Sequence, residues 1–190
     1  MSRRLIAFLS LALVAGACGD GSDSGTGPQP SPAETVATGA PSGTQRLENT
    51  ELGFTIDHPE SWTPSDQPGV AALLVNQESA QDGFAESVNV VSEEVPEEVS
   101  LDEYTEATIR NLEAGFGGLE VIGEGPTTIG DLPAHSIEYR AEQQGQTLSF
   151  LQTWLIGDTT AFVLTYTGEG EGFDDYRSDA ETIMESFRLT

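Results

Sequence analysis

The sequence predicts a domain of mixed α and β structure after about residue 45, and three observations support this. Short segments that alternate apolar and polar residues recur along this part of the chain, a pattern typical of strands. Two longer alternating segments, 147–156 and 159–167, are separated by Gly157-Asp158, a dipeptide typical of a two-residue hairpin turn. Two further segments, 101–116 and 173–185, have apolar residues at helical spacing.

Segment 147–156 has apolar side chains on both faces, which predicts a central strand covered on both sides. One face carries Leu148, Phe150, Trp154 and Ile156, the other carries Leu151 and Leu155, and the next strand places Phe162, Leu164 and Tyr166 on one face. Six shorter strands are predicted at 46–49, 54–57, 70–76, 87–92, 119–123 and 135–141.

The first helix is predicted to begin after Ser100, because Ser100 and Glu103 have the spacing of a capping box. It is expected to end at Gly117-Gly118, where glycines close a helix instead of opening one around a phosphate. Its inner face is predicted to carry Leu101, Tyr104, Thr108, Leu112 and Phe116.

The second helix is predicted from Phe173 to Glu185. Asp174 and Asp175 are expected in its first turn, where a negative charge complements the helix dipole. Its inner face is predicted to carry Phe173, Tyr176, Ala180, Ile183, Met184 and Phe187.

The first 17 residues are organised as an export signal, and Cys18 follows them. Arg3 and Arg4 precede an apolar segment that is too short to span a bilayer, and small residues come directly before Cys18. This arrangement resembles the lipobox of bacterial lipoproteins, although Ala15 stands where the lipobox usually has leucine. The resemblance implies cleavage before Cys18 and lipidation of its thiol.

The alternative is ordinary cleavage near Cys18, which would remove this residue or leave it as a free thiol. A single unpaired thiol is unusual in an exported protein, so we favour lipidation. Ser2-Arg3-Arg4 also touches the twin-arginine export pattern, but the very short basic region favours general secretion. The expected location is the extracytoplasmic face of a bacterial cell membrane.

Residues 18–44 are rich in glycine, serine and proline and contain little to bury, which predicts a disordered tether, and the lipobox resemblance implies that it is lipidated at Cys18. Residues 45–190 are long enough for one self-sufficient core. All 32 acidic residues but only five of the seven basic residues follow Cys18, so the formal charge after cleavage would be near −27. Such a charge disfavours nucleic acids and anionic lipid headgroups as partners.

Several motifs in this domain resemble PsbP-like and DcrB-like proteins, a group that includes actinobacterial lipoproteins of the LpqN type. They are the "F-x-I-x-x-P-x-x-W" segment 54–62, the turn 132–135, the strand 161–167 and the closing helix with Ser186-Phe187. The resemblance covers residues 46–190. It implies an α+β fold in which an antiparallel β-sheet is flanked by helices, and a role in binding instead of catalysis.

Two histidines are the first candidates for chemistry. His58 could hold a metal with Asp57 and Glu60, but neighbouring strand residues point to opposite faces and no zinc spacing is present. His135 shares a strand face with apolar residues, which predicts packing. Neither a G-x-S-x-G motif nor a second cysteine is present. We assign no catalytic, cofactor-binding or metal-ligating residue and no cofactor; Cys18 is the one predicted site.

Two acidic segments, 93–98 and 169–175, precede the two helices. Weak calcium binding is possible chemistry for such oxygen ligands, but neither segment has the spacing of a calcium loop, so solvated acidic loops are favoured. Trp62 and Trp154 are expected in the core in preference to stacking against a ligand, and the family resemblance implies that Trp62 is a packing anchor below the first strands.

Three functions remain open from the sequence. The first is a membrane-anchored, non-enzymatic accessory or assembly factor that binds a protein or an apolar envelope ligand. The second is a carrier that shields a lipid or an apolar peptide in a groove between sheet and helix. The third is an envelope hydrolase with an unrecognised site.

Overall fold

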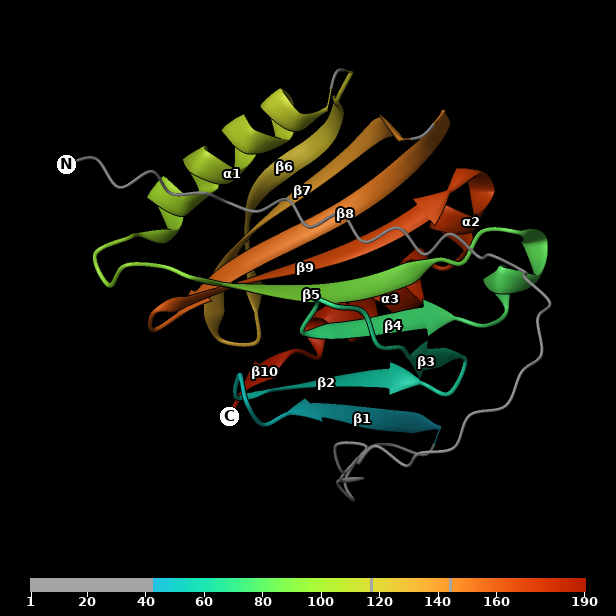
Figure 1. Cartoon of the computed structure of the whole chain (residues 1–190), viewed down its shortest axis with the longest axis horizontal. Helices are drawn as coiled ribbons and strands as arrows, with labels where there is room; N and C mark the ends of the chain where they lie inside the picture. Colours follow the sequence, from blue (N-terminus) through green and yellow to red (C-terminus); the bar gives the residue numbers. More distant parts are fainter. Residues whose placement is uncertain (1–42, 117, 144) are drawn as a thin grey trace, which may run out of the picture.

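The strand with two apolar faces lies inside a seven-stranded antiparallel sheet, as the sequence predicts (Figure 1). The computed structural model describes residues 43–116, 118–143 and 145–190. The order in the large sheet is β3-β4-β5-β9-β8-β7-β6, and a small sheet has the order β1-β2-β10. The predicted export signal (1–17), Cys18 and nearly all of the predicted tether (18–44) lie outside the described residues.

All eight predicted strands and both predicted helical regions are present, and the α+β fold is confirmed. The structure adds the short strands β3 and β10 and a 3-10 turn. The elements are β1 (Thr44–Asn49), β2 (Phe54–Pro59), β3 (Trp62–Pro64), β4 (Ala72–Asn76), η1 (Ser79–Asp82), β5 (Ser87–Glu94), α1 (Leu101–Gly115), β6 (Glu120–Ile129), β7 (Leu132–Gln143), β8 (Gln146–Gly157), β9 (Thr160–Glu169), α2 (Gly170–Asp175), α3 (Arg177–Glu185) and β10 (Arg188–Leu189).

Strand β8 divides the core into two clusters, one on each face of the sheet. Phe150 and Trp154 belong to the cluster that packs against α1, and Leu155 belongs to the cluster on the α3 side. The indole Nε1 of Trp154 donates a hydrogen bond of 2.8 Å to Thr105 Oγ1 of α1. The predicted capping box of α1 is also present, with Ser100 Oγ accepting from the Glu103 amide. The two faces of β8 therefore hold the two helical layers.

The prediction of one continuous second helix is wrong. The structure has two helices, α2 and α3, that are separated at Tyr176. The hydroxyl of Tyr166 donates to the Phe173 carbonyl at 2.9 Å, a carbonyl that a continuous helix would use for the amide of Arg177. Because α2 begins at Gly170, Asp174 and Asp175 lie at its end and not in a first turn. The predicted inner residues of both regions are buried or half-buried.

Two turns differ by a few residues from those predicted. Gly157 pairs with Thr160, so the β8–β9 turn consists of Asp158 and Thr159, and Asp158 has a φ of 50°. Residues 132–134 lie inside β7 instead of forming a turn before it, and the β6–β7 turn is at Gly130-Asp131. Both hairpins keep their strand pairing, so neither shift alters the topology.

Candidate functional site

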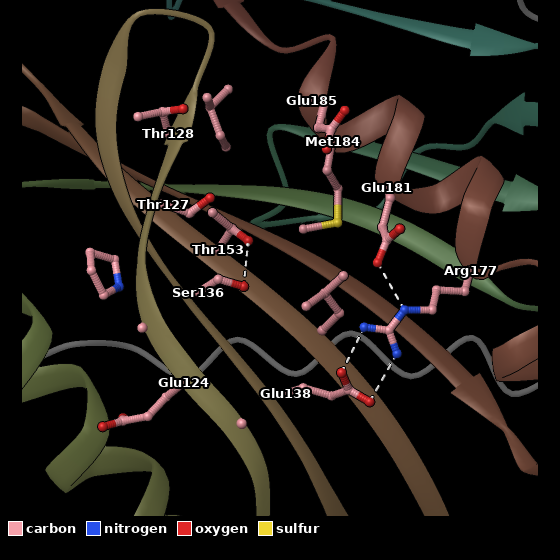
Figure 2. Close-up of a pocket in the computed structure, with 15 residues that line it drawn as sticks. Glu124, Thr127, Thr128, Ser136, Glu138, Thr153, Arg177, Glu181, Met184 and Glu185 are labelled. Atoms are coloured by element: carbon pink, nitrogen blue, oxygen red, sulfur yellow. Dashed lines mark hydrogen bonds and ion pairs between the residues drawn. The ribbon is translucent and has the colours of Figure 1, made fainter.

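A groove lies between α3 and the edge of the large sheet (Figure 2). Helix α3 packs mainly against β2 and β5, while β6 forms the edge beyond β7. The space between α3 and strands β6, β7 and β8 has a volume of about 380 Å³. This volume is at the lower end of the range of ligand pockets. We call this space the edge groove.

The floor of the edge groove follows from the strand register. Two rows of paired residues cross β6, β7 and β8. One row consists of Gly123, Glu138 and Leu151, and the other consists of Gly125, Ser136 and Thr153. Each row crosses three strands on the same face, so two glycines form the outer side of the floor. A Cβ atom added at either glycine would meet nothing within 4 Å. The glycines therefore leave the groove open toward the edge of the sheet.

Arg177 of α3 joins the helix to the floor of the groove. Its Nη1 and Nη2 donate to the two carboxylate oxygens of Glu138 at 3.0 and 2.7 Å, and its Nε donates to Glu181 at 2.8 Å (Figure 2). The hydrogen bonds with Glu138 are the main reason that the pKa of Arg177 is raised. The guanidinium carbon also lies 5.8 Å from the ring centre of Phe173, within the range of a cation–π contact.

The remaining lining is mostly polar with a small apolar part. Thr153 Oγ1 donates to Ser136 Oγ at 3.2 Å, and Thr127 lines the groove near this pair. Leu151 and Met184 supply apolar surface. Neither histidine nor cysteine is among the lining residues that the structure describes. Hydroxyl, carboxylate and guanidinium groups together can bind peptide groups and charged side chains.

Carboxylates dominate the charge inside the edge groove. Glu138 and Glu181 are paired with Arg177, and Glu185 lines the groove farther along α3, so these four side chains have a formal charge of −2. Glu124 also belongs to the lining, but its side chain points away from Arg177 in Figure 2. Its pairing with Ile137, a residue of the α1-side core, places it on the other face of β6.

The candidate metal residues near His58 are not brought together. Asp57 forms a two-point ion pair with Arg46, with nitrogen–oxygen distances of 2.6 and 2.9 Å, and the hydrogen bonds from Arg46 lower the pKa of Asp57. His58 is buried, and its Nδ1 lies 3.0 Å from the carbonyl oxygen of Pro59. Glu60 is exposed. In the described part of the chain, no three His, Cys, Asp or Glu side chains are grouped as metal ligands.

His135 and the two tryptophans are packing residues, as predicted. The imidazole of His135 stacks on the indole of Trp154, with ring centres 5.2 Å apart and an angle of 20° between the planes. Trp62 and Trp154 are fully buried, and Trp62 contacts Tyr166 at a ring distance of 6.2 Å. These three side chains thus contribute to the core.

The two acidic segments are more ordered than solvated loops. Glu93 belongs to β5 and accepts a hydrogen bond of 3.2 Å from the Tyr104 hydroxyl. Burial raises the pKa of Glu93, and the bond from Tyr104 opposes this rise. Glu97 and Glu98 are exposed, as a solvated loop requires. The second segment forms the end of β9 and the short helix α2.

Sequence reasoning did not identify the edge groove. One signal was available in β7, where polar and core residues alternate. Ile137 and Tyr139 belong to the core on one face of the strand, so Ser136 and Glu138 lie together on the other face. A second signal was the pair Gly123 and Gly125, which leaves one face of a strand without side chains. Neither signal shows that α3 lies above that face.

Comparison with known proteins gives the same fold. The chain resembles the solution structure of cyanobacterial PsbP (CyanoP) from Synechocystis sp. PCC 6803, with a TM-score of 0.61, 17% identity and coverage of 83% of this chain and 98% of that one. LpqN from Mycobacterium tuberculosis, described as involved in cell envelope biogenesis, matches with a TM-score of 0.60, 13% identity and coverage of 77% and 90%. The Ran-binding protein Mog1p from Saccharomyces cerevisiae matches with a TM-score of 0.55, 12% identity and coverage of 77% and 95%.

No curated protein has a significantly similar sequence. No helix among the described residues is long and apolar enough to cross a membrane. The family model of DcrB matches residues 51–186, a segment that begins just before β2, ends just after α3 and contains every element of the edge groove. The chain therefore belongs to the DcrB family.

Proposed function

We propose that this chain is an accessory lipoprotein of the cell envelope, anchored through a lipid on Cys18, and that it binds a partner protein through the edge groove without catalysing a reaction. The edge groove is the observation that carries this proposal. It is preformed, open at one side of the sheet, and lined by hydroxyls and carboxylates around the Arg177–Glu138 pair. Such a surface recognises polypeptide groups by hydrogen bonds and charge.

The similar structures support a binding role and an envelope location. Mog1p is described as a Ran-binding protein, and LpqN as a protein involved in cell envelope biogenesis. A lipid at Cys18 and a tether over 18–44 would keep the folded domain at the membrane but free to reach a partner. The length and composition of that segment fit a flexible spacer.

The lining of the edge groove favours a protein partner over an apolar cargo. Glu138, Glu181 and Arg177 line the groove, and burying these charges under a lipid chain would be costly. A hydrolase that uses paired carboxylates needs one of them in an apolar environment with a raised pKa. Both Glu138 and Glu181 are instead hydrogen-bonded to a cation.

Membrane fractionation and cross-linking in the native host test this proposal. We expect the wild-type protein in the membrane fraction with a diacylglyceryl mass on Cys18, and Cys18→Ala in the soluble fraction. Chemical cross-linking followed by affinity purification should recover one partner with the wild type and much less with Cys18→Ala. The anchor is wrong if Cys18→Ala stays in the membrane or if the wild type lacks the lipid, and the binding role is wrong if no specific cross-link forms.

A further inference from the structure

We infer that the edge groove accepts a lysine or arginine side chain presented by an extended segment of the partner protein. This inference rests on the proposed function and specifies the chemistry of the partner. It is carried by three features of the structure: carboxylates that outnumber the one cation among the lining residues, an open glycine side, and an edge strand that is unsuited to pairing with another strand.

The carboxylates that line the edge groove outnumber the basic side chains that line it. Arg177, Glu181 and Glu185 are spaced four residues apart and therefore lie on one side of α3. Arg177 uses Nε for Glu181 and its two terminal nitrogens for Glu138. Glu185 is exposed, and its carboxylate makes no hydrogen bond or ion pair with the described residues.

The nearest basic residue in the sequence does not fill this gap. Arg188 donates to the main-chain carbonyls of Glu185 and Phe187, at 2.6 and 2.7 Å, and its guanidinium lies beside Gly130 at the β6–β7 turn. The Glu185 carboxylate and the second oxygen of Glu181 therefore remain available to a cation that enters from outside (Figure 2).

The negative net charge of the whole chain also favours a basic partner. The sequence contains no lysine and has a formal charge of −25. A field of one sign attracts partners of the opposite charge and speeds their encounter. The same field repels a second copy of this chain, so a basic partner protein is favoured over self-association.

The glycine side of the groove indicates how the partner approaches. The space above Gly123 and Gly125 is empty, so main chain from a partner can lie over β6 without meeting a side chain there. From that position a lysine or arginine has the length to reach toward α3. Figure 2 shows Thr127, Ser136 and Thr153 along this approach, and their hydroxyls can accept or donate hydrogen bonds.

Addition of a partner strand to the outer edge of β6 is the competing binding mode, and β6 is unsuited to it. The pairing of β6 with β7 is interrupted by a bulge between Val121 and Gly123, and Pro126 lacks an amide hydrogen. Bulges and prolines are the devices by which edge strands avoid pairing. Recognition of a side chain inside the groove is therefore favoured over strand addition.

A pair of matched peptides tests the inference on the full mature chain in a non-ionic detergent. The probes are a fluorescent hexapeptide that alternates valine and lysine and its counterpart with glutamine in place of lysine. We expect the lysine peptide to bind in a saturable manner, more weakly at 0.5 M than at 0.05 M salt, and the glutamine peptide to bind at least tenfold more weakly.

Two double variants with the same change in charge separate the groove from general attraction. Glu181→Gln with Glu185→Gln removes two charges in the groove, and Glu106→Gln with Glu113→Gln removes two exposed charges on α1. We expect the first to weaken binding of the lysine peptide by about five- to tenfold and the second by less than twofold. Gly125→Val, which places a side chain in the open space, should weaken binding as the first variant does.

The inference is overturned if both double variants change the affinity equally, or if the glutamine peptide binds as well as the lysine peptide. Thermal unfolding of each variant verifies that it is folded. The proposed function can fail separately. If the lysine peptide binds in the groove but no native partner cross-links there, only the partner role is contradicted. A native partner whose cross-linking is unaffected by Glu181→Gln with Glu185→Gln would contradict the inference only.

Discussion

Arg177 and Glu138 form a two-point ion pair that joins α3 to strand β7, with nitrogen–oxygen distances of 3.0 and 2.7 Å. The two residues are 39 positions apart in the sequence, so the pair links the helix to the sheet, and both side chains line the edge groove. The contact that joins α3 to the sheet is thus also part of the proposed binding site.

Replacing Arg177 with methionine should lower the free energy of unfolding by about 1–2 kcal/mol. The pair is partly buried, with side-chain exposures of 33% and 21%, so removing one partner costs more than at an exposed pair but less than the roughly 3–5 kcal/mol at a fully buried one. Urea unfolding measures the change as a lower midpoint at an unchanged slope. Arg110→Met on the exposed side of α1 is the control and should change stability by less than about 0.5 kcal/mol. Equal effects of both substitutions would show that the pair does not hold α3.

Two glycine-to-alanine substitutions should have opposite outcomes. A Cβ atom at Gly168 would lie 2.9 Å from the Cα atom of Phe173, whose main chain cannot move freely, so Gly168→Ala should destabilise the fold by about 1–3 kcal/mol. Gly125→Ala meets open space in the groove and should be neutral or stabilising by about 0.4–1 kcal/mol. Thermal unfolding of the two variants tests this, and a loss of stability in Gly125→Ala would contradict the open glycine side.

Replacing Glu93 with glutamine should stabilise the protein at pH 7. Burial raises the pKa of Glu93 in the folded state, so folding favours the protonated carboxyl, and this contribution is lost as the pH rises through the raised pKa. Glutamine keeps an acceptor for the Tyr104 hydroxyl without the charge. The difference between Glu93→Gln and wild type should shrink as the pH falls below about 4 in urea unfolding experiments. Glu94→Gln, at an exposed position, should show no such pH dependence.

The strands and helical regions could be predicted from the spacing of apolar and polar residues, and the antiparallel arrangement followed from the family resemblance. Leu155 and Trp154 belong to opposite faces of one strand, and this alternation alone identifies β8 as a central strand. Ser100 and Glu103 likewise locate the start of α1 without any tertiary information. Such signals depend on residues that are close in the sequence.

Features that depend on distant residues could not be predicted in the same way. The break between α2 and α3 coincides with a hydrogen bond from Tyr166, which lies on the preceding strand. Strand β6 continues past Gly123 and through Pro126 because it pairs with β7. Glycine and proline are unfavourable inside a strand, so the local sequence does not predict this extension. The edge groove needs both β6 and α3 in place, so no single segment of the sequence reveals it.

Site-specific photo-cross-linking in the native envelope tests the central claim most directly. A photoreactive residue in place of Thr127 lies in the edge groove, and one in place of Glu113 lies on the exposed side of α1. We predict that position 127 cross-links one partner protein, that position 113 does not, and that Glu181→Gln with Glu185→Gln reduces the cross-link at position 127. Equal labelling from both positions, or no protein cross-linked at position 127, would contradict the account.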